Sequence, residues 1–323
     1  MRAKLPEILV TGGAGFIGSE FVRQAVSRGE RIAVVDKLTY AGDLDRLNPV
    51  KGKYQFYRQD ICDKKAINSI FNKVRPKAVA HFAAETHVDR SIADSSSFIR
   101  TNFEGTQALL EASRKFKVRR FLHVSTDEVY GEIKRGRFSE KSPLQPNSPY
   151  AASKAAGDLL VRAYARTYGF PAIVVRPCNN YGPWQYPEKL IPLAVTRALS
   201  NRKVPVFLKG RQVREWLYVA DCAEAIMTVL RKGRSGEVYN IGSGERRVNI
   251  NVVKGILNLL DKPETLIEFV KDRPGHDFRY ALRSAKIKQE LGWEAKTKFS
   301  AGLKATVRWY VEHSYKGSNA LLV

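Results

Sequence analysis

Tyr150 and Lys154 stand four residues apart in a stretch whose apolar residues recur at helical spacing, so their side chains share one helix face. A lysine cation beside a phenol stabilises the phenolate, and we expect it to lower the tyrosine pKa from its reference value of about 10. A tyrosine so placed can take the proton of a substrate hydroxyl while a hydride leaves the same carbon for a nicotinamide. The spacing is common in helices without catalytic function, so it gains meaning only together with other motifs.

Two adjacent carboxyl groups form a second candidate site. Thr126, Asp127 and Glu128 directly follow a predicted strand at 121–125, and open α/β sheets bind ligands at the carboxyl ends of their strands. Neighbouring carboxyls disfavour double ionisation, so one can stay protonated as an acid while the other serves as a base. A solvated turn is the alternative interpretation of this pair.

A glycine loop near the start of the chain predicts a dinucleotide site. Gly12, Gly15 and Gly18 lie between a strand-like run and a helical stretch, an arrangement that lets the backbone approach a pyrophosphate. Asp36 ends the next strand, where an acid accepts hydrogen bonds from an adenosine ribose and repels a ribose phosphate. This favours NAD over NADP, although the following Lys37 weakens the preference.

The elements that would position these residues alternate along the first half of the chain. Strands are predicted at 8–10, 32–36, 55–58, 78–82, 121–125 and 172–176, and helices at 16–28, 64–73, 96–116 and 150–168. This pattern is typical of βαβ units with right-handed crossovers around a parallel sheet. We therefore predict an α/β protein, with a Rossmann-type doubly wound parallel sheet and a smaller mixed C-terminal substrate domain.

A proline-rich stretch after residue 177 indicates where the two domains meet. Residues 178–210 contain four prolines and favour loops around one helix. We predict an NAD-binding Rossmann domain at 1–177, to which 212–242 returns. The substrate domain then comprises 178–211 and 243–323, with an amphipathic helix at 301–313.

Composition restricts the classes of protein to which the chain can belong. Of its 323 residues 44% are apolar, and no apolar run approaches the ~20 residues that cross a bilayer, so we expect no membrane partner. The strand-like run from Ile8 leads straight into the glycine loop, which argues against a cleavable signal peptide. Cys62, Cys178 and Cys222 lie far apart without metal-type spacing, which predicts a reducing, cytoplasmic location and no metal site.

The net charge of +23 raises the question of a nucleic-acid partner. Clustered Lys and Arg bind nucleic acids by releasing counterions from phosphates. Here the basic runs, such as 114–120 and 134–137, are short and scattered, and no helix-turn-helix, zinc-finger or aromatic RNA-binding signature accompanies them. We therefore expect no nucleic-acid partner, and assign the charge to a basic surface that partly serves a small anionic ligand.

These motifs together carry a family resemblance. The glycine loop, the Tyr150 and Lys154 pair and Asn102 resemble the extended short-chain dehydrogenase/reductase superfamily, and within it the chain resembles the dTDP-glucose 4,6-dehydratase family along nearly its whole length. The resembling segments are 36–42, 81–89, 125–131, 176–183, 188–192, 213–219 and 272–277. The acids at 127 and 128 are the most specific part, because sugar epimerases of the superfamily usually have small or polar residues there.

The resemblance implies an NAD-dependent lyase that converts dTDP-glucose to dTDP-4-keto-6-deoxyglucose and water. Tyr150 would deprotonate the 4-hydroxyl while hydride passes from carbon 4 to NAD. Glu128 would remove the proton on carbon 5, and Asp127 would protonate the departing 6-hydroxyl. Hydride would then return to carbon 6, so that NAD is recycled.

The resemblance also implies which residues contact each ligand. The cofactor contacts are Gly12, Gly15, Phe16, Ile17, Gly18, Asp36, Lys37, Thr39, Asp60, Ile61, Ala83, Ala84, Thr86, Tyr150, Lys154 and Asn180. The substrate contacts are His87, Thr126, Asn179, Lys189, Leu190, Pro205, Phe207, Arg214, Asn249, Arg273 and His276. Phe207 stands where the family often has tyrosine, which leaves both dTDP-glucose and UDP-glucose open as substrates.

Two other functions remain open at this point. An epimerase or decarboxylase would share the cofactor residues but lack the acid pair. A non-enzymatic NAD-binding scaffold would keep the glycine loop without needing the catalytic residues. The resemblance further implies a homodimer in which helices 96–116 and 150–168 of each subunit form a four-helix interface. Its apolar candidates are Ala108, Leu109, Ala112, Leu159, Leu160 and Ala163.

Overall fold

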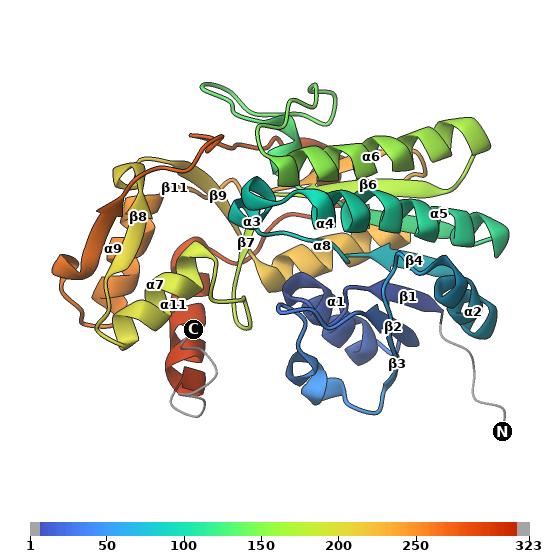
Figure 1. Ribbon diagram of the computed structural model, residues 1–323, viewed down its shortest axis with the longest axis horizontal. Coiled ribbons are helices and arrows are strands. Elements are labelled where there is room, and N and C mark those ends of the chain that lie inside the picture. Colours follow the sequence, from blue (N-terminus) through green and yellow to red (C-terminus); the bar gives the residue numbers. More distant parts are fainter. Residues whose placement is uncertain (1–6, 315–323) are drawn as a thin grey trace.

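A seven-stranded parallel sheet forms the centre of the larger part of the molecule (Figure 1). The computed structural model describes residues 7–314. The strand order is β10-β6-β5-β4-β1-β2-β3, so the chain order reverses between β1 and β4, as in doubly wound folds. The strands are β1 (Ile8–Thr11), β2 (Ile32–Asp36), β3 (Tyr54–Arg58), β4 (Ala78–His81), β5 (Arg120–Val124), β6 (Ala172–Pro177) and β10 (Val238–Ile241). The predicted fold class is confirmed.

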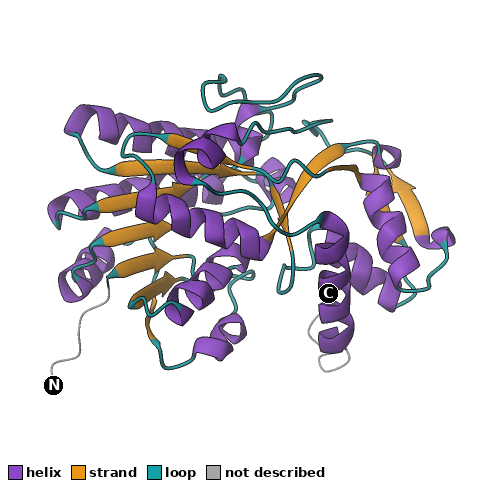
Figure 2. Cartoon of the chain, turned by 180° about the vertical axis from the view of Figure 1, so that it is seen from behind, coloured by secondary structure: helices purple, strands orange, loops and turns teal. Residues whose placement is uncertain are grey.

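Helices cover both faces of this sheet (Figure 2). On one face, α1 (Phe16–Ser27) and α8 (Val219–Lys232) pack on strand residues such as Val10 and Val34. On the other, α2 (Lys64–Val74), α5 (Thr106–Lys115) and α6 (Pro149–Tyr168) pack on their neighbours Leu9 and Val35. Successive strand side chains point to opposite faces, so strands covered on both sides are apolar throughout.

The ends of α6 follow from local sequence. The Ser148 hydroxyl accepts the N–H of Ala151 at 3.1 Å, and Pro149 occupies the first helical position. Both features favour a helix start, since proline lacks the N–H that would be left unbonded there. Gly169, with φ of 59°, ends the helix in the left-handed conformation. This fixes the helix that carries Tyr150 and Lys154.

The helix predicted at 96–116 is present but is not uniform. It consists of α4 (Ser96–Ile99), a π-helical segment η2 (Arg100–Gly105) and α5. The π segment turns Asn102 inward, where its side chain pairs with the backbone of Glu85 through N–H to Oδ1 (2.9 Å) and Nδ2 to carbonyl (3.0 Å). Periodicity alone does not reveal such an insertion.

A smaller region packs beside the large sheet. A mixed three-stranded sheet contains β11 (Arg246–Val248), β9 (Val213–Tyr218) and β7 (Asn179–Tyr181), and β12 (Ile267–Val270) pairs with β8 (Val204–Phe207). Its main helices are α7 (Leu190–Leu199), α9 (Asn249–Leu259) and α11 (Phe299–Ser314), which share one apolar core. The remaining short helices are η1 (Leu44–Val50), α3 (Val88–Ala93), η3 (Asp127–Tyr130), η4 (Leu208–Gly210), η5 (Glu264–Leu266) and α10 (Ala285–Leu291).

The chain passes between the two regions more than once. Within the segment 212–242, β9 pairs in the small mixed sheet, whereas α8 and β10 lie on the large one. The division into two domains at the predicted boundaries stays a prediction. Across residues 7–314, no helix has the length and apolar character needed to span a membrane.

Candidate active site

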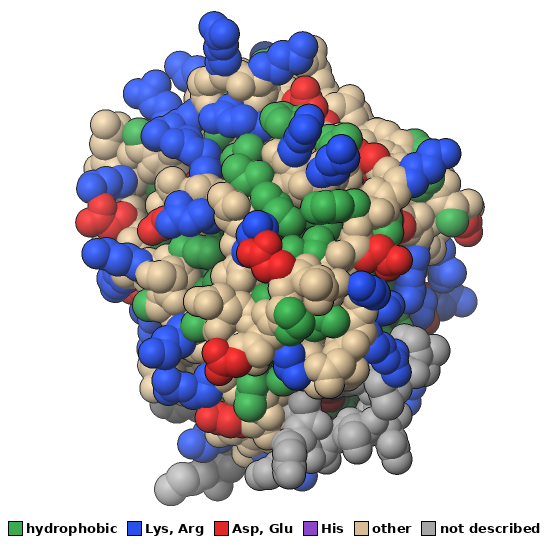
Figure 3. Space-filling model, turned by 90° about the vertical axis from the view of Figure 1, so that its left-hand side faces the viewer, with side chains coloured by type: hydrophobic (Ala, Val, Ile, Leu, Met, Phe, Trp, Pro, Cys, Tyr) green, Lys and Arg blue, Asp and Glu red, His purple; other side chains and the backbone are tan. Residues whose placement is uncertain are grey.

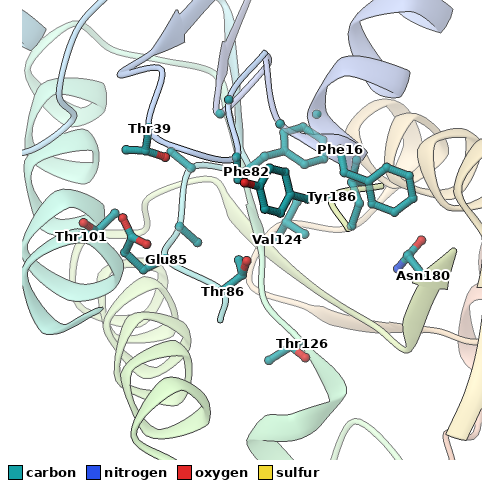
Figure 4. Close-up of a pocket in the computed structure, with 18 of the residues that line it drawn as sticks. Phe16, Thr39, Phe82, Glu85, Thr86, Thr101, Val124, Thr126, Asn180 and Tyr186 are labelled. Atoms are coloured by element: carbon teal, nitrogen blue, oxygen red, sulfur yellow. The ribbon is translucent and has the colours of Figure 1, made fainter. Parts of the chain in front are cut away.

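A cavity of about 310 Å³ lies at the carboxyl ends of the large sheet. Its walls come from the segments that follow β1, β2, β3, β4, β5 and β6, together with α6 and residues 185–189. Figure 4 shows side chains from several of these segments around it, among them Phe16, Thr39, Thr86, Thr126 and Asn180. All sixteen predicted cofactor residues and all five predicted catalytic residues line this cavity.

The glycine loop forms one wall and admits no larger residue at two positions. A Cβ on Gly12, whose φ is +70°, would lie 2.5 Å from the Ala83 nitrogen. A Cβ on Gly18 would lie 2.2 Å from the Gly12 carbonyl oxygen. Gly15, the N-cap residue of α1, provides no side-chain cap, so the first N–H groups of the helix can donate to an anion. This cradle fits a pyrophosphate.

Asp36 stands at the rim of the loop with an oriented carboxylate. Its oxygens accept the backbone N–H of Ala14 (2.9 Å) and of Leu38 (2.8 Å). Burial raises the pKa of Asp36, while these two hydrogen bonds act in the opposite direction. The neighbouring Lys37 ammonium pairs with Asp60 at 2.9 Å, which directs its charge toward that carboxylate. An acceptor at the end of β2 with a glycine cradle beside it fits NAD.

Tyr150 and Lys154 lie on the floor of the cavity, both buried. The Lys154 ammonium donates to the carbonyl of Val124 at 2.7 Å, and burial lowers its pKa to about 8. Burial and the Glu128 charge raise the pKa of Tyr150. The expectation of a lowered tyrosine pKa is therefore wrong for the protein alone, because the cost of burying a phenolate near Glu128 and Asp127 outweighs the hydrogen bond with Thr126, which acts in the lowering direction.

Asn102 connects the π segment to the catalytic helix. Its Nδ2 donates to the Ser153 hydroxyl at 2.9 Å, which in turn donates to the Tyr150 carbonyl at 2.7 Å. The Tyr150 N–H is held from the other side by the Ser91 hydroxyl at 3.1 Å. These bonds fix the first turn of α6 and hence the position from which the Tyr150 side chain projects.

The acid pair occupies η3, and its two members lie in different surroundings. Asp127 is 1% exposed, and its Oδ2 has no hydrogen-bond partner. Burial, followed by the charges of Glu128 and Glu215, raises the pKa of Asp127 well above its usual range. Burial therefore favours the protonated form of Asp127.

Glu128 is half-buried and lies nearer to positive charge. Burial raises its pKa, but Arg214, Lys189 and Arg273 act against that rise. Its N–H donates to the Thr126 hydroxyl at 3.3 Å, so Thr126 caps η3 and fixes its direction. Both pKa values are raised, but that of Asp127 the further, so Asp127 keeps its proton to higher pH than Glu128 does, as an acid beside a base requires.

The predicted substrate residues fall into two groups. Thr126, Asn179 and Lys189 line the cavity. The other eight do not line it: His87, Leu190, Pro205, Phe207, Arg214, Asn249, Arg273 and His276. Among these, the Phe207 ring lies edge-on to His276 at 5.9 Å between centroids, and the Arg273 guanidinium lies 6.0 Å from the Phe207 ring centroid.

Several of these residues have buried polar atoms without a partner in the protein. They are Oδ1 of Asn179, Oδ1 of Asn249 and Nε of Arg273. Such atoms are costly unless a ligand or water satisfies them. Arg214, in contrast, is held in place, since its Nη2 donates to the Asp277 carbonyl at 2.7 Å and its guanidinium lies over the Tyr280 ring.

Sequence reasoning did not predict how residues 186–189 contact the rest of the cavity wall. Tyr186 packs edge-on against Tyr40 at 5.2 Å between centroids, and Glu188 Oε1 accepts the Tyr40 hydroxyl at 3.4 Å. The Lys189 ammonium donates to the Thr86 carbonyl at 2.9 Å. The segments containing Tyr40, Glu188 and Lys189 all carried the family resemblance, but nothing in their spacing showed that they meet. Thr101 and Gln185 are further lining residues without a sequence signal, and Glu85 lies in a resembling segment but was not assigned to either ligand.

No group of three or more His, Cys, Asp or Glu side chains in the described part of the chain is placed to hold a metal ion. The three cysteines are unpaired, with Cys178 and Cys222 buried. The predicted catalytic residues of the cavity supply a phenol, an ammonium group and two carboxyls.

Comparison with known proteins agrees with this geometry. The profile of the GDP-mannose 4,6 dehydratase family matches residues 9–306. A dTDP-glucose 4,6-dehydratase of Streptomyces niveus is 50% identical over 311 residues, which is 94% of this chain and 92% of that protein.

Two crystal structures are similar over nearly their whole length. DesIV, a dTDP-glucose 4,6-dehydratase from Streptomyces venezuelae with NAD and TYD bound, has a TM-score of 0.93 and 47% identity, covering 96% of this chain and 98% of that one. The dTDP-glucose 4,6-dehydratase from Bacillus anthracis in complex with NAD has a TM-score of 0.89 and 45% identity, with the same coverage of 96% and 98%. The chain therefore belongs to the dTDP-glucose 4,6-dehydratase family of the extended short-chain dehydrogenase/reductases.

Proposed function

We propose that this protein is an NAD-dependent dTDP-glucose 4,6-dehydratase, a lyase that forms dTDP-4-keto-6-deoxyglucose and water. The observation that carries the proposal is the acid pair of η3, which lies on the same cavity as Tyr150 and Lys154. An epimerase needs only the tyrosine and lysine. Two carboxyls with divergent protonation are what removal of water across carbons 5 and 6 requires.

The cofactor site is proposed to consist of the glycine loop, Asp36, the segments after β3 and β4, and the first turn of α6. When bound, NAD supplies a hydride acceptor and donor whose positive charge stabilises a nearby phenolate. Lys154 adds to this as a cation fixed by Val124. The raised pKa of Tyr150 in the protein alone is thereby brought back toward the working range.

The remaining steps use the chain's own groups. Tyr150 takes the proton of the 4-hydroxyl as carbon 4 is oxidised, and the resulting ketone acidifies carbon 5. Glu128 removes the carbon 5 proton, and Asp127 gives its proton to the 6-hydroxyl, which leaves as water. Hydride would then return from the reduced cofactor to carbon 6, and a proton would be added at carbon 5, so that the product is the 4-keto-6-deoxy sugar and the cofactor is recycled. The burial that raises the pKa of Asp127 supports its role as the acid.

The nucleotide is proposed to extend from the cavity toward the smaller region. Arg214 and Arg273 supply positive charge for a diphosphate, and the unpartnered atoms of Asn179 and Asn249 can contact the rest of the nucleotide. Phe207 offers an aromatic face without a hydroxyl. UDP-glucose therefore stays the alternative substrate.

A homodimer is the proposed assembly. Leu159 on α6 and Ile99 on α4 are each 51% exposed, and Ala152 and Ala163 on α6 are also exposed. Ala108, Leu109 and Ala112, which were expected to favour the interface, are instead buried in the chain's own core. The apolar face that remains on these helices suits an isologous four-helix contact.

The basic surface is proposed to assist capture of the anionic substrate in the cytoplasm. On the face drawn in Figure 3, Lys and Arg side chains are spread over the surface among apolar and acidic ones and form no single stripe. This distribution supports small-anion capture over nucleic-acid binding, which favours a continuous basic track.

Product analysis tests the proposed function. The purified protein is incubated with dTDP-glucose or UDP-glucose, and the products are identified by mass spectrometry. A dehydratase gives a product lighter by one water, whereas an epimerase leaves the mass unchanged. Deuterium placed on carbon 4 should appear on carbon 6, and stoichiometric release of reduced cofactor would indicate a simple dehydrogenase instead.

A further inference from the structure

Four buried polar side chains connect the two catalytic segments. Asp158 lies on α6, Arg176 on β6, and Asn240 on β10, and Tyr130 is the last residue of η3. Asp158, Arg176 and Asn240 are 0% exposed and Tyr130 is 1% exposed. None of the four contributes to the chemistry proposed above, and none lines the cavity.

The four side chains form one continuous hydrogen-bonded chain. Arg176 Nε and Nη2 donate to the two carboxylate oxygens of Asp158 at 2.7 and 3.0 Å. Arg176 Nη1 donates to the Tyr130 hydroxyl at 2.7 Å, and that hydroxyl donates to Asn240 Oδ1 at 2.7 Å. Among the described residues, no unpartnered buried side-chain atom belongs to these four.

Burying a hydrogen-bonded network with a charged pair in a protein core costs desolvation free energy. Burial disfavours the charge on Arg176, yet its contact with Asp158 outweighs this and raises its pKa. Apolar residues of the same volume generally fill a core at least as favourably. A fully satisfied polar network differs from apolar packing in that it fixes one geometry.

This hydrogen-bonded network joins α6 and η3, the two elements that contain the proposed catalytic residues. Asp158 stands four residues after Lys154 and eight after Tyr150, so the three share one face of α6. Tyr130 follows the acid pair by two residues in the same short helix, η3. Arg176 thus links the helix that carries the oxidation residues to the turn that carries the elimination residues.

We propose that Tyr130 is a positioning residue which, through Arg176 and Asp158, fixes the acid pair relative to Tyr150. The inference rests on the proposed dehydratase function. In that reaction one bound sugar is first oxidised by groups of α6 and then loses water to groups of η3. Both sets must therefore be aligned to the same substrate position, and a misplacement of about 1 Å costs roughly 10²-fold in rate.

Tyr130→Phe is the variant that tests the proposal. It keeps the aromatic ring, which stacks on Phe138 at 4.9 Å between centroids, and removes only the hydroxyl. Reaction with dTDP-glucose in deuterium oxide is quenched at short times, and the sugar nucleotides are analysed by mass spectrometry. Oxidation at carbon 4 should proceed at about the parent rate, whereas water loss should slow by roughly 10- to 100-fold. The 4-keto-glucose nucleotide should therefore accumulate.

Tyr239→Phe is the matched control. Tyr239 is also fully buried, and its hydroxyl donates to Glu290 at 2.9 Å and accepts the N–H of Arg234 at 3.1 Å. Tyr239 lies one residue before Asn240 on β10, but it is not a member of the hydrogen-bonded network that reaches Tyr130 of η3. This variant should keep the parent ratio of the two steps. A general effect of losing a buried hydroxyl would instead appear in both variants.

Asn240→Ala provides a second approach should Tyr130→Phe not fold. It removes the acceptor of the same hydroxyl while leaving Arg176 and Asp158 paired, and should produce the same split between the steps. If the folded variants slow both steps equally, or neither, Tyr130 has no positioning role. A parent protein that converts dTDP-glucose to no product contradicts the proposed function itself, so the two failures are distinguishable.

Discussion

The variant Asp127→Asn is expected to change the stability of the protein and its proposed acid catalysis in opposite directions. The carboxyl is 1% exposed, one of its oxygens has no partner, and burial followed by the charges of Glu128 and Glu215 raises its pKa well above the usual range. Burial therefore favours the neutral form of this carboxyl. Asparagine has the same shape and is also neutral, so burying it at this position costs no additional charge desolvation.

The expected sign of the stability change follows from the raised pKa. Each unit by which the folded-state pKa exceeds the unfolded one corresponds to about 1.4 kcal/mol. The stabilising contribution of such a carboxyl is fully present below its unfolded pKa of about 3.9 and is lost as pH rises through the raised folded pKa. Asparagine does not titrate, so the free energy of unfolding of Asp127→Asn should increase relative to the parent as pH rises through this window.

Although Asp127→Asn should be more stable than the parent at higher pH, its activity should be lower. Loss of an acid catalyst typically costs about 10²–10⁴ in rate, equivalent to roughly 2.7–5.5 kcal/mol in the activation free energy. Water loss should slow by this factor, while exchange of the carbon 5 proton with solvent deuterium persists through Glu128. The two carboxyls are coupled, so the phenotypes overlap partly.

Two measurements check this combination. Urea unfolding at pH 5 and pH 8 gives the difference in unfolding free energy between variant and parent, and mass spectrometry gives the rate of water loss. A variant that dehydrates the substrate at the parent rate would refute the role of Asp127 as the acid. A variant that becomes less stable than the parent as pH rises would refute the assignment of a neutral buried carboxyl.

Four further outcomes are expected. Glu128→Gln should retain oxidation at carbon 4 but lose carbon 5 exchange by about 10²–10⁴, measured by NMR in deuterium oxide; unchanged exchange would contradict its role as base. Tyr150→Phe should block the first oxidation to a similar extent, so that quenched reactions contain no 4-keto sugar. Because the pKa of Lys154 is lowered to about 8, the Lys154 cation is lost as pH rises through 8, and kcat should fall over the same range. A kcat that stays constant up to pH 9 would contradict a role for the Lys154 cation. Leu159→Glu, at a position that is 51% exposed, should be monomeric in light scattering without a change of fold, whereas the parent should show the mass of the proposed dimer; a monomeric parent would contradict that proposal.

Local sequence patterns account for the large sheet because its strands are buried on both faces. Each predicted run, from Ile8 to Arg176, agrees with an observed strand within one or two residues at its ends. Such strands are continuous apolar segments separated by helices, which is a strong signal. The placement of β9 in the smaller sheet was not predictable in this way, because its pairing with β7 and β11 depends on contacts distant in sequence.

The candidate site was predictable where one local motif supplies several residues. The glycine loop, the acid pair and the catalytic helix each project from a single element into the cavity. The direction of the Tyr150 pKa was not predictable, because it depends on burial and on the charge of Glu128, which comes from another element. The contacts of Tyr186 and Glu188 with Tyr40 were missed for the same reason, because they join segments that are distant in sequence.

The π-helical segment η2 has a consequence for which changes of length the chain tolerates. A π turn accommodates one residue more than an α-helical turn, so deleting a residue from 100–105 would allow a regular α-helix to form. The extra residue is absorbed within the π turn itself, so the helix on either side of the deletion would keep its buried faces and Leu109 would still face the core. Asn102, in contrast, would lose the wide turn that directs its side chain to Glu85 and Ser153. We therefore expect a single deletion within 100–105 to disturb the contacts of Asn102 with the first turn of α6 more than it disturbs the packing of α5.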